Sequence, residues 1–483
     1  MSIRYNRKIT RREFIKVTSS GILGLATTPF VLGQDEGKGT ILQIPPHRVV
    51  RVRNVNATDW DFVTDYYWNF VRRDVVNTMV ERGAKELTNH STVLGAWQEI
   101  MSSYQSGDKI AIKINLNNYR TTTPNNHTDI NALIEVVDAV VGGLISLGIP
   151  QEDIYVFDAS RIFPSVRYQS LTIYPQVNFV EVYDVTFGQT GDPDEEIEFT
   201  HGDLSEVTKY IADVVVNSQH LINIPIMKEH CTGITGALKN HFGTINEPIA
   251  DLHETMQASE SNPLVDIYLN PHIRDKTRLI VGDGLFGMAL GDGGSGSGVP
   301  HRWSTFSDNS PNSLFFSIDP VAVDSVMLDY ILAERDAHGL WSHPHEHLHC
   351  AHSSGLGIHE HRDGGGQYHE VDFVDIEMSS SVETEQEPGP VDKFQLSQNY
   401  PNPFNLTTVI EYHLNRPARV IIAIYNVLGE RVITLVDKHQ SPGSKRIIWD
   451  GANEQGKTVA NGVYFCTLKV GGFIQSKKIA LLK

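Results

Sequence analysis

The chain has 483 residues, of which 40% are hydrophobic and 20% are charged. That length is too great for one hydrophobic core and is typical of a globular protein with two or three domains. The formal net charge is -18, with basic ends and an acidic middle, so nucleic acid is excluded as an expected partner because an acidic surface repels the phosphate backbone.

The first 33 residues predict an export signal. A basic stretch is followed by an apolar run, 17–32, that is too short and too rich in Ser, Thr and Gly for a spanning helix. The sequence TRREFIK at 10–16 resembles the twin-arginine motif. We therefore predict a twin-arginine-type signal peptide over 1–33, with the twin-arginine translocase as partner and an ordinary basic signal peptide as the alternative. No later run of eighteen apolar residues occurs, so no transmembrane segment is expected in the mature chain.

Residues 40–375 alternate between strand and helix patterns. KIAIKINLN (109–117) and IYVFDAS (154–160) predict buried strands, and INALIEVVDAVVGGLISLG (130–148) predicts an amphipathic helix between them. Such a unit makes parallel strands with a right-handed crossover. We therefore predict an α/β domain with a mostly parallel sheet and helices on both faces.

Polar side chains gather where the predicted strands end: Lys113, Asn115, Asp158, Lys228, His230 and Asp283. Lys113 and Asn115 are two residues apart and point to the same face of their strand. Ligands of such sheets bind outside the carboxyl ends of the strands, so these residues predict a site there. For Lys113 the alternative is an edge-strand lysine that faces water.

The segment MKEHCTGITGALKNHFG (227–243) carries the most specific motif, Lys-x-His followed by Thr-Gly-x-x-Lys-Asn-x-x-Gly. With its flanking strands it resembles the domain-of-unknown-function family numbered 362, in order over roughly residues 50–360. The residues that match the motif are Lys228, His230, Thr235, Lys239 and Asn240, whereas Cys231 departs from it. This resemblance transfers no reaction, because the family has none assigned.

We interpret this segment as a site for a small anionic ligand. Lys113, Lys228 and Lys239 would hold a carboxylate or phosphate, with the backbone N–H groups of Gly233 and Gly236 and the start of a helix near Thr235. His230 would transfer a proton or bind a metal, and Asp283 would complete an active site of unassigned reaction. The alternative is a turn with solvated lysines.

Histidines dominate residues 338–369, where they occupy positions 338, 343, 345, 347, 349, 352, 359, 361 and 369. Imidazoles at this density bind divalent transition metals, although the alternating spacing is not a known signature. Two alternatives remain open: a secreted, non-catalytic metal-binding protein, and an exposed loop that collects metal adventitiously. If the two His-Cys pairs meet, then His230, Cys231, His349 and Cys350 would form a four-ligand set.

An iron–sulfur cluster is not expected from this chain. Some relatives in the family carry a ferredoxin-like domain, but this chain has three cysteines, Cys231, Cys350 and Cys466, and no C-x-x-C pair. A redox partner of a separate iron–sulfur protein is the weakest alternative for its function.

Two further patterns belong to the same domain. The glycine-rich stretch 282–298 predicts a lid over the strand ends. Asp319 precedes an apolar helix, 321–333, and is predicted to cap it, whereas Asp324 would reach the site or only the surface.

The end of the chain forms a separate module. Residues 376–393 are rich in Ser, Glu and Pro and predict a linker. Short alternating strands over 394–483 predict a small β-sandwich. YPNPFN, YNVLGERV and the ending KKIALLK resemble the sorting domain of the type IX secretion system. That resemblance implies the type IX machinery as a partner and export to the periplasm, the cell surface or the medium.

Overall fold

The computed structural model describes residues 44–63, 66–116, 130–163, 172–231, 233–247, 249–290 and 300–378. It also describes 394–482, apart from 398, 400–401, 406, 415–416, 427–429, 442 and 471–472. The predicted signal peptide 1–33 and residues 379–393 of the predicted linker lie outside the described residues. Within the described part, no helix is both long enough and apolar enough to cross a membrane.

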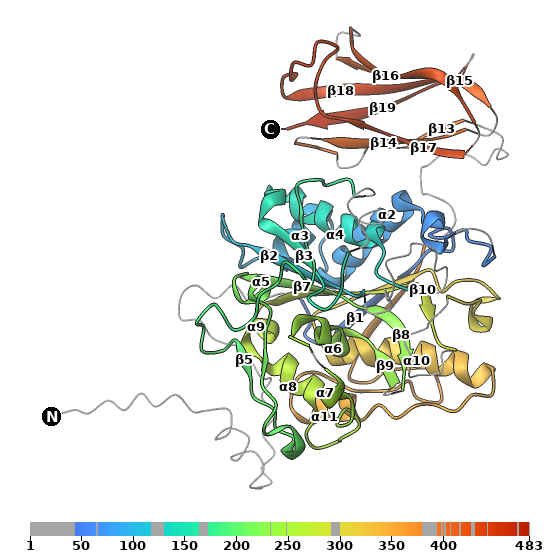
Figure 1. Ribbon diagram of the computed structural model, residues 1–483. Coiled ribbons are helices and arrows are strands. Elements are labelled where there is room, and N and C mark those ends of the chain that lie inside the picture. The colour runs from blue at the N-terminus through green and yellow to red at the C-terminus, as the bar shows by residue number, and fades with distance from the viewer. Residues whose placement is uncertain are drawn as a thin grey trace. The chain divides into compact units, whose positions relative to one another are not determined.

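A ten-stranded sheet forms the middle of the α/β part (Figure 1). Its strand order is β12-β1-β11-β10-β7-β2-β3-β4, with β8 beside β10 and β9 beside β8. The strands are β1 (Arg48–Arg53), β2 (Ile110–Ile114), β3 (Ile154–Phe157), β4 (Asn178–Val180), β7 (His220–Ile224), β8 (Ile226–His230), β9 (Gly233–Thr235), β10 (Thr277–Met288), β11 (Ser313–Ser317) and β12 (Asp372–Glu377). The run from β10 to β4 is parallel, whereas β11 is antiparallel to both β1 and β10. The predicted α/β fold is confirmed, with antiparallel pairs added on one side.

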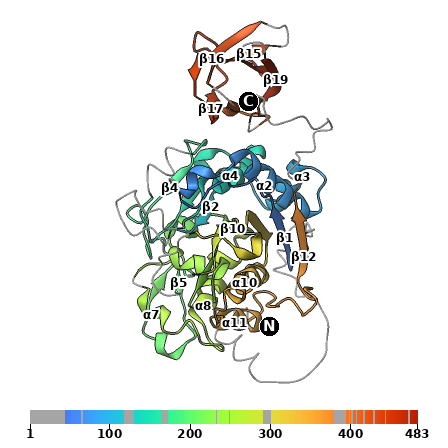
Figure 2. The same ribbon diagram turned by 90° about the vertical axis from the view of Figure 1, so that its right-hand side faces the viewer.

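Helices cover both faces of this sheet (Figures 1 and 2). One face packs against α2 (Arg73–Thr88), α3 (Val93–Ile100) and α4 (Ile134–Ser146), which is the helix predicted between the first two strands. The other face packs against α6 (Ala237–Asn240), α8 (Pro263–Leu269), α10 (Pro320–Ala337) and α11 (Glu346–Ser353). The smaller elements are α5 (Asp213–Val216), α7 (Ala250–His253), α9 (Pro271–Arg274), the two-stranded β5 (Glu196–Ile197) and β6 (Lys209–Tyr210), and the 3-10 turns 67–70, 151–153, 202–204, 241–244 and 304–306.

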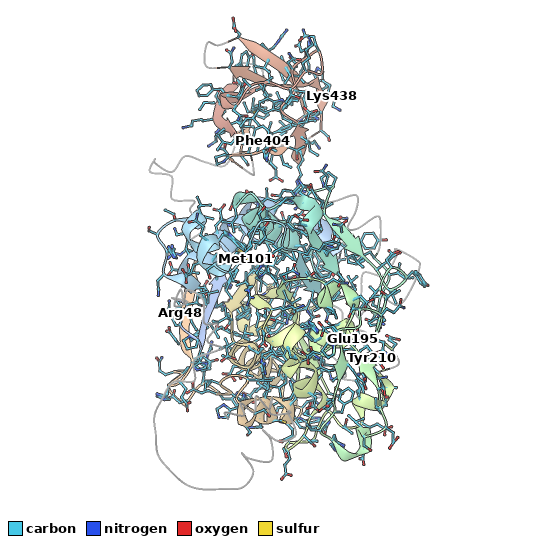
Figure 3. The ribbon with its side chains drawn as sticks, turned by 90° about the vertical axis from the view of Figure 1, so that its left-hand side faces the viewer. Arg48, Met101, Glu195, Tyr210, Phe404 and Lys438 are labelled. Carbon is cyan, nitrogen blue, oxygen red and sulfur yellow. The ribbon has the colours of Figure 1, made fainter. Side chains whose placement is uncertain are left out.

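Ion pairs hold β12 to the edge of the sheet, beside β1 (Figure 2). Arg48, labelled in Figure 3, donates from Nε to Asp372 at 2.7 Å, and it faces Asp372 in the strand register. Arg51 and Arg53 make the corresponding ion pairs with Asp375 and Glu377. Because β12 follows the histidine-rich segment, these pairs fix the end of that segment on the sheet.

Two sequence predictions change in this region. The stretch 282–288 is the end of the buried strand β10 and not a lid, while residues 291–299 lie outside the described part. The histidine-rich segment is not simply an exposed loop, since α11 occupies 346–353 and buries His347 and Cys350.

The C-terminal part consists of two antiparallel sheets, ordered β13-β14-β17 and β16-β15-β18-β19. Its strands are β13 (Gln395–Leu396), β14 (Thr408–Leu414), β15 (Ala418–Asn426), β16 (Arg431–Gln440), β17 (Gly443–Trp449), β18 (Gly462–Val470) and β19 (Phe473–Leu481). Inward-facing residues such as Ile422, Trp449 and Leu468 form its own core. The predicted small all-β module is confirmed.

Candidate functional site

Lys113 lies on β2 in the middle of the sheet and is buried. Its Nζ is 3.3 Å from Oδ2 of Asp158, and it donates to Oδ1 of Asn240 at 3.2 Å and to the carbonyl of Ile114. Burial lowers the pKa of Lys113, and the charge of Asp158 opposes that shift. The alternative that Lys113 is an edge-strand lysine facing water is therefore wrong.

Amide side chains extend this contact into a network. Asn240 accepts from Nδ2 of Asn115 at 3.3 Å and donates to Oδ1 of Asn223 at 2.7 Å. A Cβ added at Gly243 would lie 2.5 Å from Oδ1 of Asp158, so only glycine fits there without displacement. The structure thus brings Lys113, Asn115 and Asn240 together, but it joins them to a carboxylate of the protein itself. We call these residues, with Asp158 and Asn223, the Lys113 network.

The hairpin β8–β9 positions a second set of side chains. Lys228 pairs with Thr235 and His230 pairs with Gly233 in an antiparallel register. Directly opposed residues, and residues two apart in a strand, share one face of a hairpin, so Lys228, His230 and Thr235 face the same way. Lys228 and Thr235 are both buried, and the Thr235 hydroxyl has no hydrogen-bond partner among the described residues.

Lys239 reaches the same place from α6. Its Nζ lies 3.3 Å from Nε2 of His253, 3.7 Å from the sulfur of Met256 and 4.3 Å from the ring centre of Phe242. His253 donates from Nδ1 to the carbonyl of Ile249 at 2.8 Å, so its Nε2 accepts from the lysine. The partners of this buried ammonium group are therefore uncharged.

Lys228, His230 and Lys239 affect one another electrostatically. Burial, and then the charge of Lys228, lowers the pKa of Lys239 to about 7. Burial, followed by the charges of Lys239 and Lys228, lowers the pKa of His230 to about 2. We call Lys228, His230, Thr235, Lys239 and His253 the lysine cluster. No motif in the sequence pointed to His253.

The start of α6 is not an anion site. Its backbone N–H groups at Ala237 and Leu238 donate to the buried carboxylate of Asp324, at 2.6 and 3.1 Å. The predicted role of this helix start is therefore wrong, because the side chain of Asp324 already occupies it. Asp319 caps α10 as predicted, accepting from Val321 and Ala322 at 2.8 and 2.9 Å.

Asp283 lies on β10, where its carboxylate accepts the backbone N–H of Leu285 at 3.1 Å. In the strand register it stands beside Ile226 of β8 and Leu314 of β11. The structure shows this contact within its own strand, and a catalytic role for Asp283 stays a prediction.

Three histidines gather around α11. One ring nitrogen from each of His345, His349 and His359 lies within 4.8 Å of the other two. Burial, and then the charge of His361, lowers the pKa of His359 to about 2, and burial lowers that of His345. These two rings are therefore neutral at pH 7, the form in which imidazole binds metal.

The predicted four-ligand set of His230, Cys231, His349 and Cys350 is wrong. Cys350 is buried in the hydrophobic core, and burial raises the pKa of its thiol to about 11. Consecutive residues of a helix do not face the same side, so His349 and Cys350 of α11 cannot both turn toward one ion. Cys231 instead lies beside His230, with its sulfur 3.4 Å from Nδ1.

The three-histidine group and the lysine cluster are neighbours. A Cβ added at Gly233, whose φ is +99°, would lie 2.8 Å from Cβ of His345. Buried His347 contributes to lowering the pKa of both His230 and His359. The segment with the motif and the histidine-rich segment thus meet, although Gly233 and His345 are 112 positions apart in the sequence.

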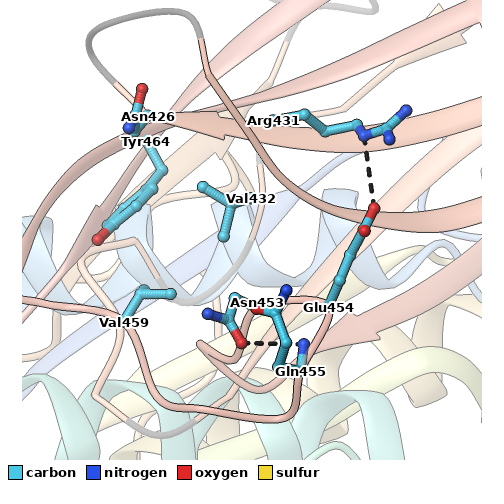
Figure 4. A pocket seen from close by; sticks show the side chains of 8 residues that line it. All are labelled: Asn426, Arg431, Val432, Asn453, Glu454, Gln455, Val459 and Tyr464. Atoms are coloured by element: carbon cyan, nitrogen blue, oxygen red, sulfur yellow. Dashed lines mark hydrogen bonds and ion pairs between the residues drawn. The ribbon is translucent and has the colours of Figure 1, made fainter.

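A pocket of about 270 Å³ lies in the C-terminal part (Figure 4). Its charged groups pair with each other, since Nε of Arg431 is 3.4 Å from Glu454. The backbone of Gln455 donates to Asn453 at 3.1 Å, which closes a local turn. We assign no ligand to this pocket.

Comparison with protein families gives two matches. Residues 110–329 match the model "Domain of unknown function (DUF362)", which confirms that part of the resemblance predicted from the sequence. Residues 405–471 match the model "FlgD Ig-like domain", and not a model of a type IX sorting domain. No curated protein matches the sequence.

Solved structures resemble parts of the chain. Latent PorU from Porphyromonas gingivalis is 23% identical over 19% of this chain and 10% of its own, with a TM-score of 0.17. PorZ from the same organism, a surface component of the type IX secretion system, is 17% identical over 19% of this chain and 12% of its own, with a TM-score of 0.15. FlgD from P. aeruginosa is 20% identical over 15% of this chain and 59% of its own, with a TM-score of 0.13. The chain thus spans about a tenth of the length of PorU and PorZ, and likenesses of this size identify no activity for it.

Proposed function

We propose that the α/β domain binds a small oxyanion, a carboxylate or a phosphate group, at the lysine cluster. The observation that carries this proposal is the buried Thr235 hydroxyl, which lacks a hydrogen-bond partner among the described residues and stands opposite Lys228. A buried polar group without a partner costs about 1–3 kcal/mol, so such groups usually mark a place that a ligand or water completes.

The charges support the same ligand class. The Lys239 ammonium group is buried against His253, Met256 and Phe242, all uncharged. An oxyanion would supply the missing negative charge and accept hydrogen bonds from both Lys239 and Thr235. It would also raise the pKa values of Lys239 and of the neighbouring His230, and Lys239, with a pKa lowered to about 7, is then the group that holds a proton near neutral pH.

The test is calorimetric titration of the full chain with inorganic phosphate at pH 6.5. We expect Lys239→Met to weaken binding by tenfold or more, because a charge-assisted hydrogen bond contributes about 1.5–3 kcal/mol. Lys109→Met is the matched control, since Lys109 is exposed at the start of β2 and its variant loses the same charge. Equal weakening in both variants would mean that only the net charge matters, and the proposal would fail.

Binding should also depend on pH. With the pKa of Lys239 lowered to about 7, the free ammonium group is protonated below pH 7 and loses its charge above it. We therefore expect phosphate affinity to fall as the pH rises from 6 to 9, and this fall to be smaller in Lys239→Met.

We further propose that the protein is exported, through the twin-arginine translocase and then the type IX machinery. The motif TRREFIK at 10–16 and the C-terminal motifs YPNPFN and KKIALLK support this. In a host with both systems, replacing Arg11 and Arg12 by lysines should retain the protein in the cytoplasm, whereas the same change at Arg4 and Arg7 should not. Deletion of 394–483 should leave it in the periplasm. An unchanged distribution in cell fractions would contradict the proposal.

A further inference from the structure

The ring nitrogens of the three-histidine group lie close to the spacing that one metal ion requires. His345 immediately precedes α11 and His349 follows one turn later, while His359 comes from the segment after the helix. The ring centres are 5.3 Å apart for His345 and His349, 5.3 Å for His345 and His359, and 4.5 Å for His349 and His359. Tetrahedral zinc with Zn–N near 2.1 Å holds its ligand nitrogens about 3.4 Å apart. Small side-chain rotations would bring nitrogens that lie within 4.8 Å to that spacing.

Hydrogen bonds leave a lone pair on His359. The hydroxyl of Ser325 donates its proton to the carbonyl of Val321 at 2.8 Å and therefore accepts from Nδ1 of His359, also at 2.8 Å. The proton of this ring is then on Nδ1, and Nε2 carries the lone pair. Nε2 is buried and has no partner among the described residues.

A second chain of hydrogen bonds does the same for His345. Nδ1 of His361 bonds to Asp329, and in the neutral ring with its proton on Nδ1 the lone pair of His361 is on Nε2. Nε2 of His345 lies 3.1 Å from that atom and donates to it, which leaves the lone pair of His345 on Nδ1. That Nδ1 is the other buried ring nitrogen of the group without a partner among the described residues.

Both free nitrogens thus belong to rings whose other N–H is already held by an oxygen or nitrogen acceptor. This is the arrangement in which proteins present metal-ligating histidines, because the outer partner fixes the tautomer and the ring orientation. A merely structural cluster would instead leave two buried acceptors unsatisfied.

We propose that His345, His349 and His359 bind a divalent transition metal ion of the zinc type, with Ser325 and the Asp329–His361 pair as positioning residues. Three imidazoles favour zinc and its neighbours Co²⁺, Ni²⁺ and Cu²⁺ over Mg²⁺ or Ca²⁺. The site uses other side chains than the neighbouring lysine cluster and does not rest on phosphate binding there.

The experiment titrates the chelator-treated full chain with Zn²⁺ in competition with a chromophoric chelator, and with Co²⁺ followed by visible absorbance. The wild-type chain should bind one ion tightly, with a Co²⁺ spectrum of nitrogen coordination. His349→Gln should weaken Zn²⁺ at least tenfold, and because His349 is exposed this variant should keep the fold, as the unfolding curve of the metal-free protein will show. Ser325→Ala should weaken Zn²⁺ about 10- to 100-fold while the Co²⁺ spectrum stays of the same type.

The matched control is His369→Gln, in the same histidine-rich segment, whose side chain is 71% exposed and contacts Asp363. It should bind Zn²⁺ like the wild type. If His349→Gln keeps wild-type affinity, or if His369→Gln loses as much as His349→Gln, then the segment collects metal adventitiously and the proposed site is overturned.

Discussion

The Lys113 network and the lysine cluster both place buried lysines at the same sheet, yet they are completed in different ways. Lys113 lies 3.3 Å from the carboxylate of Asp158, and every amide around it is paired with another. Lys239 has only uncharged partners in the described contacts, and the hydroxyl of Thr235 nearby has none. A buried charge that has a counter-charge in the chain is compensated, and the cost appears only when that partner is removed. A buried charge without such a partner already costs stability and marks a place for a ligand.

The largest effect is expected where the completed network is broken. Asp158→Ala leaves the ammonium group of Lys113 buried without its counter-charge, which should cost about 3–5 kcal/mol in the free energy of unfolding. Unfolding of the variant and the wild type in denaturant measures this loss in the free energy of unfolding. Asp203→Ala, at a side chain that is 86% exposed, should stay within about 0.5 kcal/mol of the wild type. A small loss at Asp158 would show that the two lysines do not differ in the way described.

Removal of the charge of Lys239 in the lysine cluster should instead raise the free energy of unfolding. Lys239→Met removes a buried cation and should raise the free energy of unfolding by roughly 1–3 kcal/mol at pH 6 in phosphate-free buffer. In the wild type the unfolded chain holds the Lys239 proton up to its ordinary pKa, well above the folded value of about 7, so the penalty is full below pH 7 and disappears as the pH rises toward that ordinary value. The gain in Lys239→Met should shrink accordingly in unfolding curves between pH 6 and 10. A gain that does not change with pH would exclude this cause.

A smaller change in stability is expected when the hydroxyl of either of two threonines is removed. Thr235→Val removes a buried hydroxyl without a described partner and should stabilise the free protein by about 1 kcal/mol while weakening phosphate binding. Thr244→Val makes the same change at a hydroxyl that bonds Nδ1 of His241 at 3.0 Å, so it should destabilise by about 1 kcal/mol. Thermal unfolding of both variants, with and without phosphate, measures these opposite changes in stability. Loss of stability at both positions would show that Thr235 has a structural partner.

Much of the fold could be predicted because its signals are local. Apolar runs gave the positions of β2 and β3, and the helices α4 and α10 followed from their periodicity and from Asp319 as a cap. The antiparallel strands β1 and β11 and the edge strand β12 did not follow from any local pattern. Their pairing depends on contacts such as Arg48 with Asp372, which are 324 residues apart.

In the candidate site, too, local motifs could be predicted, whereas the contacts between distant residues could not. The motif at 227–243 identified Lys228, His230, Thr235 and Lys239, and the density of histidines identified the segment of the three-histidine group. The wrong predictions concerned partners: Asp324 occupies the start of α6, and Cys350 faces the core and not an ion. His253 was missed because a single histidine fourteen residues after Lys239 has no pattern to distinguish it.

By itself, the sequence determined the α/β class, the C-terminal β module and the residue types available to bind an anion or a metal. Only the tertiary structure decided which lysine is neutralised, which is not, and which three histidines converge. The reason is physical: periodicity and motifs report on neighbours along the chain, whereas burial and charge pairing depend on groups such as Asp158, Ser325 and Asp329 that folding brings in from distant positions.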